Sequence, residues 1–446
     1  MNRIVTLLIL ISSVSVLMAQ GKAGDASYGT LSYDDFERPV TCRPCHTNFY
    51  YQWDQSMMSI AYTHHWDEIE YFKLAIPHAD MEPEVAEVKA GCNGCHTPMA
   101  FRAGDTPPPH PEENSRANES VFCDVCHTIT GFEGDIPFNF NFYSSPGKVK
   151  YGPKPNVQSP YHTSQYNELF TQAEFCGGCH NEKSPYGIWV KSTHLEWLEG
   201  PYPAQNVTCQ TCHMPKAEGV SALMGEKGMV AQHLFHGAHD DGKMRSVIEM
   251  RMEPNAREVE PGERVTFSLQ LFNAKTGHKF PTGSAEERVV WVHVEAVDAE
   301  GKTYPLPVDK KGFEGEEYTI ASEVLAYQDM GIPLKEPDFK GVRREMVPVG
   351  DRVYRMPYLN PDGEMTIMQW YTSALGVDYR IGPRETKVET YTWQIPDNVA
   401  PGKLTVKAEM YYRKIPVAVA QYLGVPEEES RAVFINDAST WIEIFD

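Results

Sequence analysis

The sequence has few basic residues, because 40 Lys and Arg stand against 61 Asp and Glu and give a formal net charge of −21. No run rich in Lys or Arg interrupts this excess of acidic residues. Contacts to phosphate groups need clustered Lys and Arg, so the composition excludes nucleic acid as a partner and argues against anionic lipid. With 446 residues, of which 41% are hydrophobic, the chain has a globular composition and is long enough for two or three domains.

Long apolar runs are also lacking. The run from Ile4 to Ala19 has 16 residues, fewer than the roughly 20 that span the hydrocarbon core of a membrane. Arg3 precedes it and a small residue closes it, which is typical of a secretory signal peptide, with a single membrane anchor as the alternative. We expect residues 1–19 to be removed and the mature protein to have no membrane span. The protein would then be exported. The periplasm is the favoured location, and the cell surface and the exterior of the cell are the alternatives.

No cysteine stands outside one repeated pattern. The ten cysteines form five Cys-x-x-Cys pairs, and a histidine follows each pair at once. A single pair would suit a redox dithiol or half of a zinc site, but five with the same histidine indicate c-type haem attachment. In that chemistry the two thiols add to the porphyrin vinyl groups and the histidine binds the iron from the proximal side. The motifs comprise Cys42, Cys45 and His46; Cys92, Cys95 and His96; Cys123, Cys126 and His127; Cys176, Cys179 and His180; and Cys209, Cys212 and His213.

Five covalent haems with their irons are therefore the expected cofactors. The motifs fall within residues 42–213, so the porphyrins would form much of the core. We expect residues 20–242 to be a pentahaem cytochrome c domain of mostly short helices and loops. The starts of the motifs lie 50, 31, 53 and 33 residues apart. This alternation suggests that motifs two and three form one pair and motifs four and five another, with coincidence as the alternative.

No cysteine follows Cys212, and the pattern of the chain changes near residues 240–243. Apolar and polar residues then alternate, which predicts many short strands. We expect residues 243–446 to form an all-β, immunoglobulin-like sandwich domain, with a long loop-rich insertion from Glu314 to Tyr379. No nucleophile motif occurs in this half. The predicted strands include Val265–Leu271, Val290–Val294, Val388–Trp393, Leu404–Met410 and Trp441–Ile444.

Three phrases carry a family resemblance. The segments Gln52–Met58, Cys209–Pro215 and Thr276–Gly283 resemble exported multihaem c-type cytochromes. Within these, the chain is similar to the branch related to the tetrahaem cytochrome that accepts electrons from hydroxylamine oxidation. The third phrase resembles the β-domain that is joined to the haem domain in many such proteins. The chain departs from the pattern by having five motifs rather than four, and by Met58 where the Trp-x-x-Ser phrase usually leads to a histidine.

The second, distal ligand of each iron decides between a carrier and an enzyme. Iron with two strong protein ligands passes electrons, whereas an open iron can bind a small substrate. Sixteen histidines leave eleven beyond the five motifs, more than the five required. His110, in a proline-rich stretch, and His293, on a strand face, are expected at the surface. The distal candidates are Met58, His64, His65, His162, His194, His233, His236 and His278.

Two of these predictions depend on local structure. The segment around Met58 and His65 has helix-like composition, and the two residues lie seven positions apart, about two helical turns, so both would face the first haem from one helix face. Core packing is the alternative for Met58. His278 lies in a stiff Gly- and Pro-containing loop after a strand. It would reach a haem across the domain boundary, unless it merely bonds a backbone carbonyl.

The favoured interpretation is a carrier that transfers electrons between redox partners outside the cytoplasmic membrane. The alternative is an oxidoreductase acting on a small nitrogen or sulfur compound at one open-sided haem, and a third interpretation makes the β-domain a docking or polymerising module. No Cys-x-x-Cys-Lys variant marks an unusual haem. Because the chain is acidic, we expect its redox partners to offer a basic docking patch. The sequence leaves the oligomeric state and the identity of the partners open.

Overall fold

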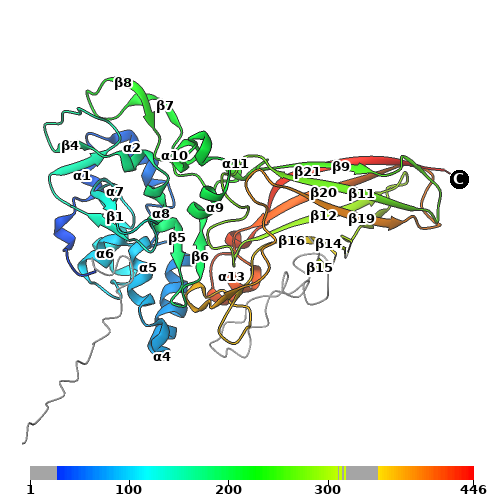
Figure 1. Ribbon diagram of the computed structural model, residues 1–446, viewed down its shortest axis with the longest axis horizontal. Helices are drawn as coiled ribbons and strands as arrows, with labels where there is room; N and C mark the ends of the chain where they lie inside the picture. Colours follow the sequence, from blue (N-terminus) through cyan, green and yellow to red (C-terminus); the bar gives the residue numbers. More distant parts are fainter. Residues whose placement is uncertain (1–27, 310, 314–315, 318–349, 446) are drawn as a thin grey trace, which may run out of the picture.

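The computed structural model describes residues 28–309, 311–313, 316–317 and 350–445. Short helices and small sheets make up the N-terminal part, and long strands make up the C-terminal part (Figure 1). The expected signal peptide and most of the expected insertion lie outside the described residues. Within the described ranges, no helix has the length and apolar character needed to cross a membrane.

In the N-terminal part, helices lie at the Cys-x-x-Cys-His motifs. Four of its helices, α5, α7, α8 and α10, end at the histidine of a motif, and α1 ends at Cys42. Between them lie four separate two-stranded sheets, β1–β2, β3–β4, β5–β6 and β7–β8. The helices are α1 (Pro39–Cys42), α2 (Thr47–Asp54), α3 (His65–Glu70), η3 (Tyr71–Ala75), α4 (Ile76–Met81), α5 (Val88–His96), α6 (Pro98–Ala103), α7 (Cys123–His127), α8 (Glu174–His180), α9 (Thr193–Glu199), α10 (Cys209–His213) and α11 (Asp241–Met244), with 3₁₀ turns η2 (Tyr33–Asp35), η4 (Pro83–Val85), η5 (Pro111–Glu113), η6 (Arg116–Glu119), η7 (Glu168–Thr171) and η8 (Pro203–Gln205). The strands are β1 (Ile129–Phe132), β2 (Phe142–Ser144), β3 (Val149–Gly152), β4 (Thr163–Tyr166), β5 (Asn181–Lys183), β6 (Trp189–Ser192), β7 (Lys216–Val220) and β8 (Lys227–Ala231).

The segment that carries Met58 and His65 is not one helix, contrary to the prediction. It consists of α2 and α3 with irregular turns between them. In these turns Ser56 Oγ donates to the Trp53 carbonyl at 2.7 Å, and Ser59 Oγ donates to the Ser56 carbonyl at 2.8 Å. Such side-chain bonds to the backbone compete with the helical pattern of hydrogen bonds. Met58 and His65 therefore do not share a helix face.

The C-terminal part contains two larger sheets. One has the strand order β10–β21–β20–β12–β13, with β16 paired to β12, and the other has the order β19–β11–β9. The five strands predicted from alternation lie within β11, β12, β19, β20 and β21. The elements are β9 (Ile248–Pro254), β10 (Glu258–Val259), β11 (Arg264–Asn273), β12 (Val289–Val297), β13 (Thr303–Pro305), β14 (Lys311–Phe313), β15 (Glu316–Glu317), β16 (Arg352–Tyr354), β17 (Tyr358–Leu359), η10 (Gln369–Tyr371), β18 (Ala374–Leu375), β19 (Thr386–Gln394), β20 (Gly402–Arg413), α13 (Val417–Leu423), η11 (Glu427–Ser430) and β21 (Val433–Ile444).

The two larger sheets share one hydrophobic core. Alternate residues of β11 from Val265 to Leu271 are fully buried, and they pack with Val292 of β12 and with Val406 and Met410 of β20. Strict alternation of buried and less buried residues along β11 and β20 gives each strand one apolar face. The C-terminal part therefore forms its core from its own side chains.

The described end of the expected insertion is packed rather than loose. Ile367 and Trp370 are buried in a cluster with Tyr71 and Leu74 of the N-terminal part, and α13 packs on the same cluster. Trp370 Nε1 donates to His78 Nδ1 at 3.0 Å. Glycine, proline and charge in the sequence concealed these apolar anchors. The chain thus joins its two parts through apolar contacts as well as through the segment near residue 240.

Candidate functional site

The five motifs lie beside one another in the N-terminal part. The side chains of Cys42 and Cys123 lie close together, as do those of Cys95 and Cys179 and those of Cys176 and Cys209. Motif one therefore contacts motif three, and motif four contacts both motif two and motif five. The spacing suggested the contact of motif four with motif five, but it paired motif two with motif three. The structure instead brings α5, which carries motif two, against α8, which carries motif four.

Four of the five motif histidines share one orientation. In each, Nδ1 lies within hydrogen-bonding distance of a backbone carbonyl. A carbonyl only accepts a hydrogen bond, so Nδ1 carries the proton and Nε2 keeps its lone pair for a metal. This is the tautomer that a proximal haem ligand needs. The Nδ1–oxygen distances are 2.6 Å from His46 to Ser221, 2.7 Å from His96 to Ala61, 2.7 Å from His127 to Tyr151 and 2.8 Å from His213 to His236.

Three motif histidines each face a second histidine across a gap. When two imidazoles bind one metal ion from opposite sides, each nitrogen lies about 2 Å from the metal, so the ring centroids lie about 6 Å apart. The three observed separations fit one iron each, and the planes of the rings are close to parallel. The centroid distances and interplanar angles are 6.3 Å and 24° for His46 and His162, 6.4 Å and 25° for His127 and His233, and 6.4 Å and 19° for His213 and His278.

Burial lowers the pKa of five of these six imidazoles. Desolvation lowers the pKa of His213 and of His233 to about 4. It also lowers the pKa of His127, His162 and His278 below the usual value. A neutral imidazole with a free Nε2 is the form that binds iron, so these residues fit the group that the motifs indicate.

A buried polar network holds the loop of His278 against α9. Glu196 of α9 accepts hydrogen bonds from Thr282 Oγ1 at 2.6 Å and from the Lys279 backbone N–H at 3.2 Å. The other oxygen of Glu196 lies 2.6 Å from Arg380 Nη1. His278 Nδ1 lies 2.9 Å from the Lys279 carbonyl oxygen, which leaves Nε2 free to face His213. The β part thus presents an imidazole at the fifth motif.

The other distal candidates lie elsewhere. Met58 packs in an apolar cluster of the N-terminal part. His194 is buried beside motif four, with Nδ1 3.1 Å from Asn181 Nδ2 and no hydrogen-bond partner for Nε2. The His236 ring lies 3.0 Å from Asp240, and only its carbonyl serves a motif histidine.

His64 and His65 meet Glu429 of η11 rather than the first motif. His239 approaches the same carboxylate, 3.7 Å away. Sequence reasoning missed His239 and Glu429 as members of this cluster, because no local pattern connects them to α3. His293, expected at the surface, is instead half-buried, with Nδ1 2.9 Å from Oδ1 of the buried Asp351 and Nε2 3.7 Å from Glu295.

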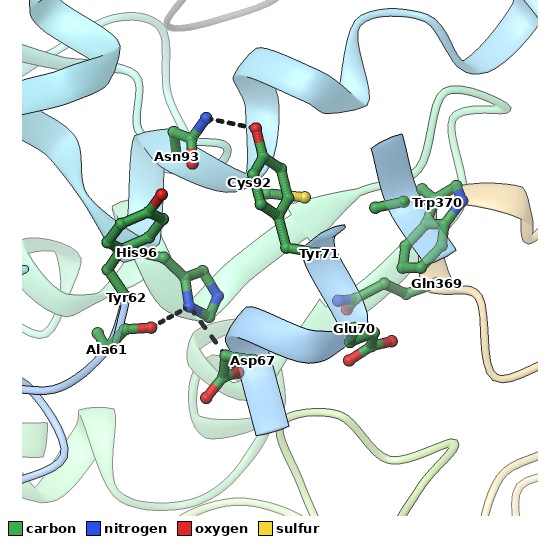
Figure 2. A pocket seen from close by; sticks show the side chains of 11 residues that line it. Ala61, Tyr62, Asp67, Glu70, Tyr71, Cys92, Asn93, His96, Gln369 and Trp370 are labelled. Atoms are coloured by element: carbon green, nitrogen blue, oxygen red, sulfur yellow. Dashed lines mark hydrogen bonds and ion pairs between the residues drawn. The ribbon is translucent and has the colours of Figure 1, made fainter. Parts of the chain in front are cut away.

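His96 and His180 differ from the three paired motif histidines. Among the described residues, no second histidine ring faces either of them at a comparable distance. His96 instead lines a pocket with Glu70, Tyr71 and Gln369, whose side chains surround the same space (Figure 2). Burial and the nearby Glu286 raise the pKa of Glu70 to about 8.

Two family models match the chain. The model of cytochrome c554 and c-prime matches residues 41–128, which hold the first three motifs. The model of the NapC/NirT cytochrome c family, N-terminal region, matches residues 157–296, which hold the last two motifs and His278. Both are families of multihaem c-type cytochromes, so the matches support covalently bound c-type haem and electron transfer. No curated protein matches the chain.

A solved structure shares the fold over nearly the whole chain. The penta-haem cytochrome c552 from Thermochromatium tepidum superposes with a TM-score of 0.61 at 20% identity, covering 93% of this chain and 99% of that one. The C-terminal domain of wzt reaches a TM-score of 0.20 at 6% identity, covering 45% of this chain and 72% of that one. The CARDB domain of a Pyrococcus furiosus protein reaches 0.18 at 11% identity, covering 45% and 92%. These two scores are too low to support a common fold.

Proposed function

We propose that the protein transfers electrons between redox partners outside the cytoplasmic membrane through five covalently bound haems. The observation that carries this proposal is the set of three histidine pairs with ring centroids 6.3 to 6.4 Å apart. Two imidazoles on opposite sides of an iron make it six-coordinate, and such an iron exchanges electrons without binding a substrate.

The chain supplies the ligands and their orientation. The cysteines of each motif would hold one porphyrin, and the histidine of the motif would be the proximal ligand. In all three paired sites a backbone carbonyl fixes this histidine. His162, His233 and His278 would be the distal ligands at motifs one, three and five. When bound, haem supplies an iron that changes by one electron. The residues that surround each iron tune its potential through burial and nearby charge.

The thiol contacts support a continuous path for electrons. Motif one touches motif three, and motif four touches motifs two and five. Cys126 of motif three and Cys179 of motif four pack against the same apolar cluster, so motif three also lies beside motif four. All five porphyrins would therefore be neighbours, and an electron that enters at one end of the path could leave at the other.

The proposed organisation is a signal peptide at 1–19, a pentahaem domain at 20–242 and an immunoglobulin-like sandwich at 243–446. Two sheets around one core support the sandwich, and export would place the protein in the periplasm. The match to cytochrome c554 and c-prime supports a place near the hydroxylamine-oxidation branch. A net charge of −21 favours partners with a basic patch, and electron exchange with them should slow as salt rises.

Electron paramagnetic resonance and visible spectra of the purified holoprotein test the ligand assignment. His162→Ala, His233→Ala and His278→Ala should each convert one haem from low spin to high spin. His110→Ala is the matched control, since His110 Nε2 pairs with Glu68 at 2.9 Å, away from the paired rings. Low-spin haems in all three variants would refute the assignment.

The alternative function is an oxidoreductase of a small nitrogen or sulfur compound at the haem of His96. The specific observation is the pocket with Glu70, Tyr71 and Gln369, in which no second histidine appears among the described residues. The amide of Gln369 and the carboxyl of Glu70, which burial keeps protonated near neutral pH, can donate hydrogen bonds to a bound anion. Addition of nitrite or hydroxylamine should then shift the spectrum of about one haem in five. An unchanged spectrum would exclude this function.

A further inference from the structure

Three histidines converge on one carboxylate outside the five motifs. His64 and His65 stand at the N-terminus of α3, His239 lies just before α11, and Glu429 belongs to η11. Glu429 Oε1 lies 3.8 Å from His64 Nε2 and 3.5 Å from His65 Nε2. Glu429 Oε2 lies 3.7 Å from His239 Nε2.

These separations suit a metal ion better than hydrogen bonds. An imidazole N–H that donates to a carboxylate lies about 2.7 to 3.0 Å from the oxygen. Ligands that surround one ion at about 2 Å are farther from one another, about 3 to 4 Å. One ligand atom from each of His64, His65 and Glu429 lies within 4.8 Å of the other two. The Nε2 atoms of His65 and His239 are buried and have no hydrogen-bond partner.

The surroundings orient the ligands. Asp67 Oδ2 lies 3.2 Å from His64 Nδ1, so it fixes that ring with Nε2 toward Glu429. Lys414 Nζ lies 2.6 Å from Glu429 Oε2 and leaves Oε1 available to an ion.

The cluster lies behind the second motif rather than at an iron. Asp67 lies between His64 and His96, and its Oδ1 is 3.8 Å from His96 Nδ1. That nitrogen is on the side of the ring away from the iron-binding Nε2. His64 therefore cannot serve the iron of His96 from the distal side, and at the first motif His162 already faces His46.

We propose that His64, His65 and Glu429 bind one divalent transition-metal ion, for which Zn²⁺ is the probe, separately from the haems. Two nitrogens and one carboxylate oxygen are three of the four ligands of a tetrahedral Zn²⁺ ion, and a water molecule would supply the fourth. Such an ion would tie α3 of the N-terminal part to η11 of the C-terminal part. His65 is 38% exposed at its side chain, which gives the ion a path of entry.

The test uses the chelator-treated holoprotein with its haems attached. Titration with Zn²⁺, followed by calorimetry and by elemental analysis after desalting, should show one zinc per chain in addition to the haem iron. His65→Ala and Glu429→Gln should each weaken zinc binding at least tenfold, while the haem spectra stay unchanged. Glu429→Gln keeps the shape of the side chain, and far-ultraviolet circular dichroism checks that it folds.

The matched control is His110→Ala. Its side chain is 38% exposed, as in His65, and it faces Glu68 of the same helix α3. This variant should bind zinc as the wild type does. Equal zinc binding in the wild type, His65→Ala and Glu429→Gln would overturn the proposal. A change of haem spin state in His65→Ala would also overturn it, because His65 would then be a haem ligand.

Discussion

The histidines of the two parts of the molecule are held in opposite ways. Burial lowers the pKa of ten imidazoles that lie in the N-terminal part or pack against it. In the large sheet, His293 Nδ1 lies 2.9 Å from Asp351 Oδ1, and this hydrogen bond raises the pKa of His293. A carboxylate partner favours the charged ring, whereas burial beside carbonyls leaves a neutral ring with a free nitrogen. The ten are His65, His78, His127, His162, His180, His194, His213, His233, His239 and His278.

The cores of the two parts also differ, because only the β part builds its core from its own side chains. The β part buries alternate residues of long strands against one another. Apart from residues 65–81, where α3, η3 and α4 follow one another without a break, the N-terminal part has no helix longer than the nine residues of α5 among its described elements. Its buried imidazoles leave nitrogens for a metal. Haems would supply the missing apolar surface, and their irons would bind these free nitrogens. The N-terminal part should therefore depend on haem for its fold, and the β part should not.

The largest expected effect comes from preventing haem attachment. With serine in place of the cysteines of all five motifs, the N-terminal part should lose its compact structure, since neither porphyrins nor iron would hold its short helices together. The β part should keep its own core. Limited proteolysis with mass spectrometry should then show rapid cleavage N-terminal to about residue 243 and a resistant C-terminal fragment. Equal resistance of both parts, or rapid loss of both, would break the comparison.

Local sequence was enough to find what covalent chemistry or alternation imposes. The spacing of Cys-x-x-Cys-His is set by the porphyrin, and the apolar alternation of β11 and β20 is set by the pleat of a strand. Local sequence could not show that His46 pairs with His162, because the two residues are far apart in the chain and only tertiary packing brings them together. The same holds for Glu429, which reaches α3 from the far end of the chain. The prediction of a helix around Met58 was wrong, because the hydroxyls of Ser56 and Ser59 bond to backbone carbonyls and the segment forms turns.

The next largest effect concerns the buried ion pair of Glu196 and Arg380, which fixes the His278 loop. Both side chains are 3% exposed. Glu196→Gln should lower the free energy of unfolding by about 1.5 to 3 kcal/mol, because it removes one of the two carboxylates that Arg380 contacts and weakens a buried charged hydrogen bond, while Asp378 stays 2.9 Å from Arg380 Nε. Thermal unfolding followed at the Soret band and by far-ultraviolet circular dichroism measures the loss in each part.

The exposed pair Lys407 and Glu409 provides the control. Its nitrogen–oxygen distance is 2.5 Å, but the lysine side chain is 43% exposed. Lys407→Ala should therefore cost less than about 1 kcal/mol. If Glu196→Gln cost no more than this control, the link between the two parts would not rest on the buried pair.

A smaller effect compares two glycines at the same place in two motifs. In motif four, a Cβ at Gly178 would overlap the Phe142 ring, whereas in motif two a Cβ at Gly94 would lie 3.1 Å from Phe140 Cβ. Gly178→Ala should cost about 1 to 3 kcal/mol through overpacking, and Gly94→Ala should cost less. Midpoints of thermal unfolding of the two holoproteins give the order. The reverse order would show that the packing around α8 yields more readily than the packing around α5.

The smallest effect tests the β side of the histidine comparison. The pKa of His293 is raised, so its bond to Asp351 stabilises the fold below the ordinary histidine pKa of about 6.5, and this contribution is lost as the pH rises through the folded value. Burial of Asp351 raises its own pKa while His293 lowers it, so the comparison is best made at pH 6.0, where the carboxylate is still charged. The imidazole is 26% exposed, which limits the contribution to about 0.5 to 1 kcal/mol.

His293→Gln should therefore destabilise the β part at pH 6.0 and leave it nearly unchanged at pH 8.5, as measured by urea unfolding. Asp351→Asn should show the same pH dependence, because it removes the other half of the pair. A loss of equal size at both values of pH would mean that His293 acts by packing alone, as the buried neutral histidines of the N-terminal part would without a metal.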